Sequence, residues 1–173
     1  EILRCLVGSE MCIRDSYIHG AMSAVTSGRL SSFYRTAERL GLQIPDEYIR
    51  EAAYRDTATT YRMTNELLDL PDPPTCIIYP DDFASFGGIN AIRERGLRIP
   101  EDISVAGYDG IQFARQLEPR LTTVQQDTEQ IGCLAARELI SLIERPKTTI
   151  IEQVIVPGKV VEGKSVAQIP TDK

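Results

Sequence analysis

Apolar residues recur along this chain at helical and strand-like spacings in alternation. A first helix is predicted from Thr26 to Gly41, because one face carries apolar residues at three- and four-residue steps: Leu30, Phe33, Ala37 and Leu40. Similar spacing predicts helices over about 57–68, from Asp82 as N-cap to Gly96, and from Asp127 as N-cap to about 145.

Short apolar, β-branched blocks lie between these helices. Strands are predicted at about 48–53, 75–79, 103–109 and 150–156. Strands that alternate with helices of this length are typical of a parallel sheet covered on both faces, so the sequence predicts an α/β, doubly wound fold.

Composition narrows the class of protein. The chain is 42% hydrophobic with a net charge of −6, and it contains no apolar run long enough to cross a bilayer. Nucleic-acid binding needs clustered Lys and Arg, so this segment is not expected to bind DNA itself. Cys76 and Cys133 sit in apolar surroundings and are expected to be buried, and His19, the only histidine, is assigned no catalytic or metal role.

The first sixteen residues, EILRCLVGSEMCIRDS, have no clean helical or strand period. They resemble, codon by codon, one reading frame of the adapter used in transposon-based DNA sequencing libraries. We therefore expect residues 1–16 to be adapter-derived and exclude them from the functional interpretation.

Four charged residues fall where ligands bind in open parallel sheets, at the carboxyl ends of strands and in the first helical turns. They are Arg29, Arg55, Asp81 and Asp109. Two carboxylates and two guanidiniums suit a polyhydroxylated ligand such as a sugar or nucleoside. Plainer interpretations stay open: Asp82, and to a lesser degree Asp81, could cap a helix, Asp109 could seed a turn, and Arg55 could be solvated.

Enzyme signatures are absent from the sequence. It has no GxGxxG, GxxxxGK[ST] or GxSxG motif and no metal-spaced His or Cys set. The glycines of SFGGIN lie inside a predicted helix and indicate close helix packing. Acid–base chemistry by Asp81 and Asp109 is left open, although nothing in their spacing favours it.

Three stretches together resemble a known family in order and spacing: HGAMSAVTSGRLSSF, PTCIIYPDDFASFGGINAIRERGLRIPEDISVAGYD and PRLTTVQQDTEQIGCLAARELISLIE. The family is the effector-binding domain of the lactose repressor/galactose repressor regulators, and the similarity covers nearly all of residues 17–165. It implies a periplasmic-binding-protein-like type I fold, with one complete lobe and C-terminal pieces of another. The lobe would span 17–125, residues 126–156 would belong to the mostly missing first lobe, and 157–173 would be a tail.

The resemblance also implies site residues and partners. Arg29 matches the arginine of the family's R-x-x-G-F motif, Asp81 the first residue of its Asn-Asp pair, and Asp109 the aspartate of its Gly-Tyr/Phe-Asp motif. Gln126 lies at the crossover strand, and Tyr54 or Arg55 stands where the family places an aromatic that stacks on the sugar ring.

The function implied is that of a cytoplasmic, homodimeric transcription regulator without cofactor, enzymatic activity or membrane partner. A sugar-like effector between the lobes would change operator binding by an N-terminal helix-turn-helix that this chain lacks. The alternative is an extracytoplasmic sugar-binding protein of a transport system, which shares the two lobes.

Overall fold

The fold is built on one sheet, which is confirmed as mostly parallel. The computed structural model describes residues 14–148, 150 and 153–167. The sheet order within these residues is β2-β1-β3-β4-β5-β6. The first five strands pair in parallel, and β6 runs antiparallel to β5. The strands are β1 (Asp15–His19), β2 (Ile49–Glu51), β3 (Cys76–Ile78), β4 (Ser104–Asp109), β5 (Thr122–Gln125) and β6 (Lys159–Val161).

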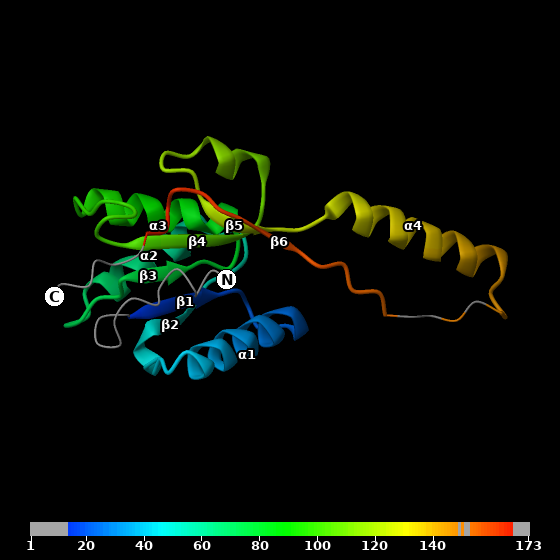
Figure 1. Ribbon diagram of the computed structural model, residues 1–173, viewed down its shortest axis with the longest axis horizontal. Coiled ribbons are helices and arrows are strands. Elements are labelled where there is room, and N and C mark those ends of the chain that lie inside the picture. Colours follow the sequence, from blue (N-terminus) through cyan, green and yellow to red (C-terminus); the bar gives the residue numbers. More distant parts are fainter. Residues whose placement is uncertain (1–13, 149, 151–152, 168–173) are drawn as a thin grey trace.

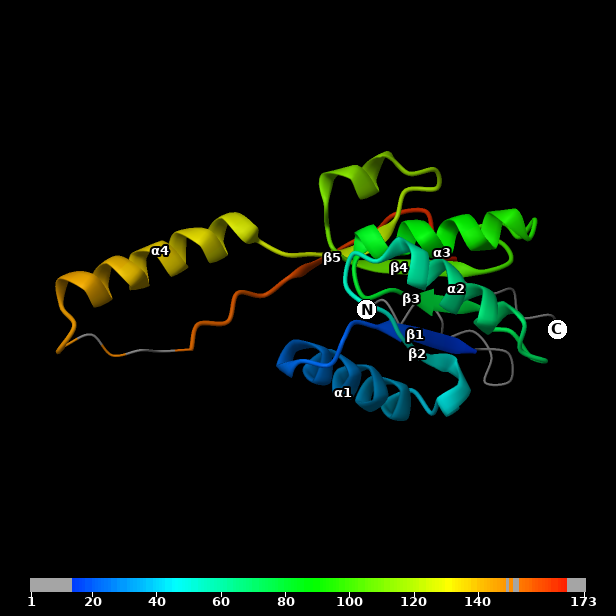
Figure 2. The ribbon, with the colours of Figure 1, turned by 180° about the vertical axis from the view of Figure 1, so that it is seen from behind.

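Helices cover both faces of this sheet. They are α1 (Ala24–Arg39), α2 (Thr57–Leu68), α3 (Asp82–Glu94) and α4 (Thr128–Glu144), with short 3-10 turns η2 (Asp46–Tyr48) and η3 (Gln112–Gln116). In Figures 1 and 2, α1 lies on one face, α2 and α3 lie on the other, and α4 projects away from the sheet. The predicted doubly wound α/β fold is therefore confirmed.

The main core lies between the sheet and the pair α2 and α3. Its fully buried members include Ile18, Leu67, Ile77, Tyr79 and Ile92. A smaller cluster of Tyr17, Phe33 and Cys76 lies between α1 and the sheet. The apolar spacing seen in the sequence thus corresponds to two separate buried layers.

Two adjacent glycines set the close packing of α3. A Cβ on Gly87 would overlap the main chain of Thr57 in α2, and a Cβ on Gly88 would overlap the Tyr79 ring. The Tyr79 hydroxyl in turn pairs with Thr64 Oγ1 at 3.0 Å. The prediction that SFGGIN marks close helix packing is confirmed.

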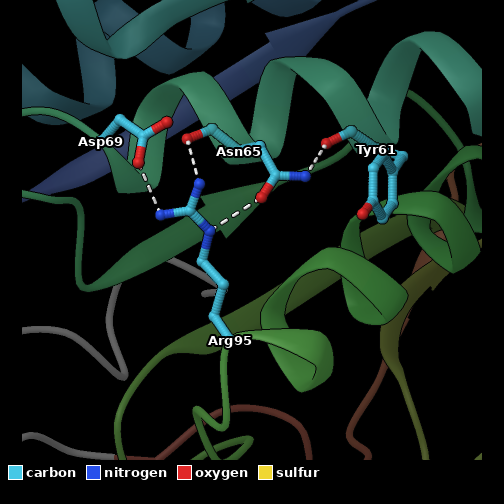
Figure 3. A network of polar contacts seen from close by, with 4 residues as sticks. All are labelled: Tyr61, Asn65, Asp69 and Arg95. Carbon is cyan, nitrogen blue, oxygen red and sulfur yellow. Dashed lines mark hydrogen bonds and ion pairs between the residues drawn. The ribbon is translucent and has the colours of Figure 1, made fainter.

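A polar network on the surface joins the ends of α2 and α3 (Figure 3). The Arg95 guanidinium donates to Asp69 Oδ1 at 2.6 Å and to Asn65 Oδ1 at 2.7 Å. The side-chain amide of Asn65 donates to the Tyr61 carbonyl at 3.0 Å. The Arg95 hydrogen bond holds the pKa of Asp69 below its ordinary value.

Helix α4 has no buried residue. Ile143 is 71% exposed, and Ile131, Leu139 and Ile140 are also exposed. The helix begins at Asp127 as predicted, since this side chain accepts a hydrogen bond from Gln130 N at 3.0 Å. The expectation that Cys133 is buried was wrong, because no residue of the helix that carries it is buried, whereas Cys76 is buried as expected.

The chain after α4 also departs from prediction. The strand predicted over 150–156 is not formed by Ile150 or residues 153–156, and residues 151–152 lie outside the described residues. Among the described residues, no strand of the sheet pairs with this segment to supply main-chain partners. Instead, β6 pairs with β5, and the buried Ser165 hydroxyl donates to the Val105 carbonyl at 2.6 Å. Part of the predicted tail therefore packs on the sheet.

Strand β1 starts inside the segment expected to be adapter-derived. Asp15 and Ser16 are fully buried, while residues 1–13 of that segment lie outside the described residues. Asp15 lies beside Cys76 of β3, and neither of its carboxyl oxygens has a hydrogen-bond partner among the described residues. Burial raises the pKa of this carboxyl to about 7. An apolar strand position is thus occupied by an ionisable residue.

Candidate functional site

The carboxyl ends of β1, β3, β4 and β5 meet along one edge of the sheet, and the predicted site residues are placed around this edge. Arg29 reaches it from α1. Its Nη1 donates to the Pro80 carbonyl, just after β3, at 3.0 Å, and its Cζ lies 3.5 Å from the centre of the Tyr108 ring. This cation–π contact fixes the guanidinium above the ends of β3 and β4.

Tyr108 was not among the residues predicted for the site. The Arg29 guanidinium stacks on its ring, and Tyr108 directly precedes Asp109 at the end of β4. The aromatic residue in the sequence GYD was the available signal, but the sequence alone does not show that it contacts a residue 79 positions earlier.

Tyr54 lies in the loop after β2 and contacts the start of α1. Its hydroxyl pairs with Thr26 Oγ1 at 2.8 Å, and its ring covers Gly20, where a Cβ would overlap it. The Arg29 Cζ lies 5.9 Å from the ring centre, and 37% of Tyr54 is exposed. The ring therefore offers an accessible face beside the arginine.

Asp81 is the N-cap of α3, which corrects the prediction that Asp82 is the cap. Its Oδ1 accepts from Ala84 N at 2.7 Å, and its Oδ2 accepts from Arg55 N at 2.8 Å. The sequence alone does not separate two adjacent aspartates, because the choice depends on which residue has extended backbone geometry. Asp81 is buried and holds the loop that carries Arg55, and a direct contact with an effector stays a prediction.

Asp82 is the first residue of α3 and is fully buried. Its carboxylate accepts from Thr123 Oγ1 at 2.5 Å and from Ile111 N at 2.8 Å. Burial raises the pKa of this carboxyl, and these hydrogen bonds oppose the rise. Asp82 thereby ties α3 to β5 and to the loop after β4.

Arg55 and Asp109 both have left-handed backbone conformations, with φ of 62° and 111°. Such conformations cost about 1–3 kcal/mol in a residue other than glycine and cluster at functional sites. The Arg55 side chain is exposed, which also fits the solvated alternative. The two strained residues lie around the same edge of the sheet.

Asp109 is joined to the crossover segment. Gln126 Nε2 donates to Asp109 Oδ1 at 2.5 Å, and Gln126 N donates to the Asp109 carbonyl at 3.2 Å. Burial raises the pKa of Asp109, whereas the Gln126 hydrogen bond and the positive charges of Arg29 and Arg55 lower it. Asp109 at the end of β4 therefore interacts with both arginines and, through Gln126, with the chain that leads to α4.

A cavity of about 640 Å³ opens beside this cluster. Arg29, Tyr108 and Gln126 are among its polar lining residues. Its apolar walls include Tyr17, Phe33, Ile78, Val124 and Val160. Tyr54, Arg55, Asp81 and Asp109 do not line it, so we place the candidate site at the polar edge, where the hydrogen-bonding groups converge.

The described part of the chain contains neither a cluster of metal-ligating side chains nor a membrane-spanning helix. Among residues 14–148, 150 and 153–167, no group of three or more His, Cys, Asp or Glu side chains could hold a metal ion. No helix in the same residues is both long and apolar enough to cross a membrane. What the edge offers is a set of donors, acceptors and aromatic faces suited to holding a polar small molecule.

Comparison with known proteins identifies the class. Residues 16–166 match the family described as periplasmic binding protein-like domain, and the chain belongs to this family. The resemblance to the effector-binding domain of lactose repressor/galactose repressor regulators is likewise confirmed by its relatives.

Among its relatives, the probable HTH-type transcriptional repressor ExuR of Bacillus subtilis is 41% identical over 107 residues, covering 62% of this chain and 32% of that protein. The HTH-type transcriptional repressor PurR of Serratia proteamaculans is 34% identical over 156 residues, covering 88% of this chain and 45% of that protein.

Solved structures give the same result. A putative transcriptional regulator LacI from Bacillus cereus subsp. cytotoxis aligns with a TM-score of 0.83 at 25% identity, over 88% of this chain and 54% of that one. A LacI family transcriptional regulator from Enterococcus faecium with bound ribose aligns with a TM-score of 0.76, also at 25% identity, over 88% of this chain and 56% of that one. The chain thus spans about half of these relatives or less.

Proposed function

We propose that this chain is the effector-sensing part of a transcription regulator that responds to a sugar or a similar polyhydroxylated ligand. The observation that carries the proposal is the convergence of Arg29, Asp109 and Gln126 at the carboxyl edge of the sheet, in a chain whose relatives are named as transcriptional repressors. Tyr54, Arg55 and Asp81 complete the proposed binding set, in which Asp81 acts by holding Arg55 in place.

The geometry supports a two-lobe mechanism. Gln126 bonds Asp109 at the start of the segment that leads to α4, so a ligand that contacts this pair would touch the connection between the lobe and α4. The exposed apolar side chains of α4 support its assignment to a second lobe. An effector can shift the lobe arrangement, and through it DNA binding, only by its differential affinity for the two states.

The remaining parts of the proposal rest on the relatives. We assign operator binding to a helix-turn-helix preceding this segment, homodimer formation to the whole protein, and the cytoplasm as its location. The names of the relatives favour a regulator over a transport protein or an enzyme.

The genomic sequence upstream of the codon for residue 17 tests this proposal. A coding region for a helix-turn-helix and the rest of a first lobe would support it. A signal peptide in that position would contradict it and favour the extracytoplasmic sugar-binding protein.

A further inference from the structure

The two carboxylates of the candidate site differ in how far their charge is available to a ligand. Asp81 is only 2% exposed, and each of its oxygens already accepts a main-chain N–H, from Ala84 and from Arg55. Asp109 is half-buried, and one of its oxygens accepts from Gln126. Most of the negative charge of the site is therefore directed into the protein.

The two arginines are much less engaged. The Arg29 guanidinium donates a hydrogen bond of 3.0 Å to the neutral Pro80 carbonyl and stacks on Tyr108. Among the described residues, no hydrogen bond or ion pair engages the guanidinium of Arg55, and this side chain is exposed. The Arg29 guanidinium bonds the Pro80 carbonyl and the Arg55 N–H bonds the next residue, Asp81, so both arginines lie around the end of β3.

The main chain fixes the position of the more exposed arginine. Arg55 has a φ of 62° and its N–H is bound by the buried Asp81, so its backbone cannot turn away from the edge without losing this hydrogen bond. Tyr54, the preceding residue, is held in turn by Thr26. The guanidinium therefore extends from an anchored loop.

We propose that the effector carries an anionic group, a carboxylate or a phosphate, that Arg29 and Arg55 bind together. This inference rests on the proposed function and specifies its ligand class. With a neutral sugar bound, the two guanidinium charges would be balanced only by the Asp109 carboxylate, which already accepts a hydrogen bond from Gln126. An anionic group would instead form charge-assisted hydrogen bonds with both guanidiniums. Asp109 and Gln126 remain to bind ring hydroxyl groups, and the exposed face of Tyr54 lies beside them.

The test is an NMR titration of the ¹⁵N-labelled complete gene product, which supplies both lobes, with D-glucuronate, D-glucose 6-phosphate and D-glucose, three probes that share a pyranose ring. We expect at least one anionic probe to bind about tenfold more tightly than glucose, the gain from one charge-assisted contact. The affected signals should include Arg29, Arg55, Asp109 and Gln126. Preference for glucuronate would identify a carboxylate, and preference for the phosphate ester would identify a phosphate.

Variants separate a specific contact from general charge attraction. Arg55→Gln should abolish the preference for the anion, and Arg55→Lys should retain most of it. Arg35→Gln makes the same charge change at an exposed position of α1 whose guanidinium bonds Ser32, and it should have no effect.

Two results would overturn the inference in different ways. Equal or tighter binding of glucose at the same residues would refute the anionic group and leave the sugar-sensing function standing. If neither glucose nor either anion shifted these residues, the proposed site itself would be wrong, and the inference with it.

Discussion

Asp15 should destabilise this chain at neutral and alkaline pH. Its carboxyl is fully buried without a hydrogen-bond partner among the described residues, and burial raises its pKa from 3.8 to about 7. Because the folded state holds this proton more tightly than the unfolded state, the contribution of Asp15 to stability is complete below about pH 4. It is lost as the pH rises toward 7. At about 1.4 kcal/mol per pH unit, the loss amounts to about 4 kcal/mol.

The perturbation is Asp15→Asn, which removes the charge and nearly preserves the shape, together with Asp15→Val, which suits a buried strand. Urea unfolding of the three proteins should be measured from pH 4 to pH 8. The difference in unfolding free energy between Asp15→Asn and the parent should grow by about 4 kcal/mol over this range. Asp15→Val should be the most stable variant at pH 8, because it also removes the unpaired polar atoms.

Asp102→Asn provides a control of opposite sign. Hydrogen bonds from Arg98 lower the pKa of Asp102 to about 2, so its stabilising effect is present above about pH 4 and is lost on acidification. Removing Asp102 should therefore cost stability at pH 7 and little at pH 2. If the curves of Asp15→Asn and the parent ran parallel from pH 4 to pH 8, the burial argument for Asp15 would be refuted.

Two further predictions concern packing and surface charge. Gly88→Ala should lower the unfolding free energy by about 2 kcal/mol in urea titrations, because its Cβ would overlap the Tyr79 ring. Gly132→Ala in α4 is the control: its Cβ would meet open space, so it should raise the helical circular dichroism signal without that loss of stability. Arg95→Met should raise the pKa of Asp69 toward its ordinary value of 3.8 in an NMR titration, because the guanidinium that lowers it is gone, and an unchanged pKa would contradict the network in Figure 3.

Sequence patterns predicted the elements that bury a continuous face. The spacing of Phe33 and Ala37 in α1, and the apolar run of β3, report burial directly because their partners lie within the described chain. Cys133 shows the limit of that reasoning: its helix is amphipathic, but the pattern cannot say whether a covering surface is present. The predicted strand over 150–156 failed for the same reason, since a strand needs a neighbour.

The sequence predicted that several charged residues lie at one edge of the sheet, but not the contacts that they make. The carboxyl-edge rule placed Arg29 and Asp109 correctly at one edge. Which aspartate caps α3 depends on the backbone conformation at Asp81, and the contact of Arg29 with Tyr108 joins residues far apart in the sequence, so neither is encoded in a local pattern. The three-residue β6 is too short to carry a period at all.

The expectation that residues 1–16 are adapter-derived stays a prediction, and it links to Asp15. If it is correct, we predict that the natural gene encodes an apolar residue at this position of β1, because the neighbouring buried cluster is apolar. Genomic sequence from an independent source settles this in the same read that tests for the helix-turn-helix.

The most direct test of the central claim is a mobility-shift titration of the complete gene product on its own promoter DNA, with and without the sugar probe that binds this chain. We predict that the probe changes the DNA affinity by at least about fivefold, the lower end of ordinary coupling between sites. Arg29→Ala should abolish this change while DNA binding without the probe persists. A protein that does not bind the DNA, or whose DNA affinity does not respond to the probe, would contradict the claim.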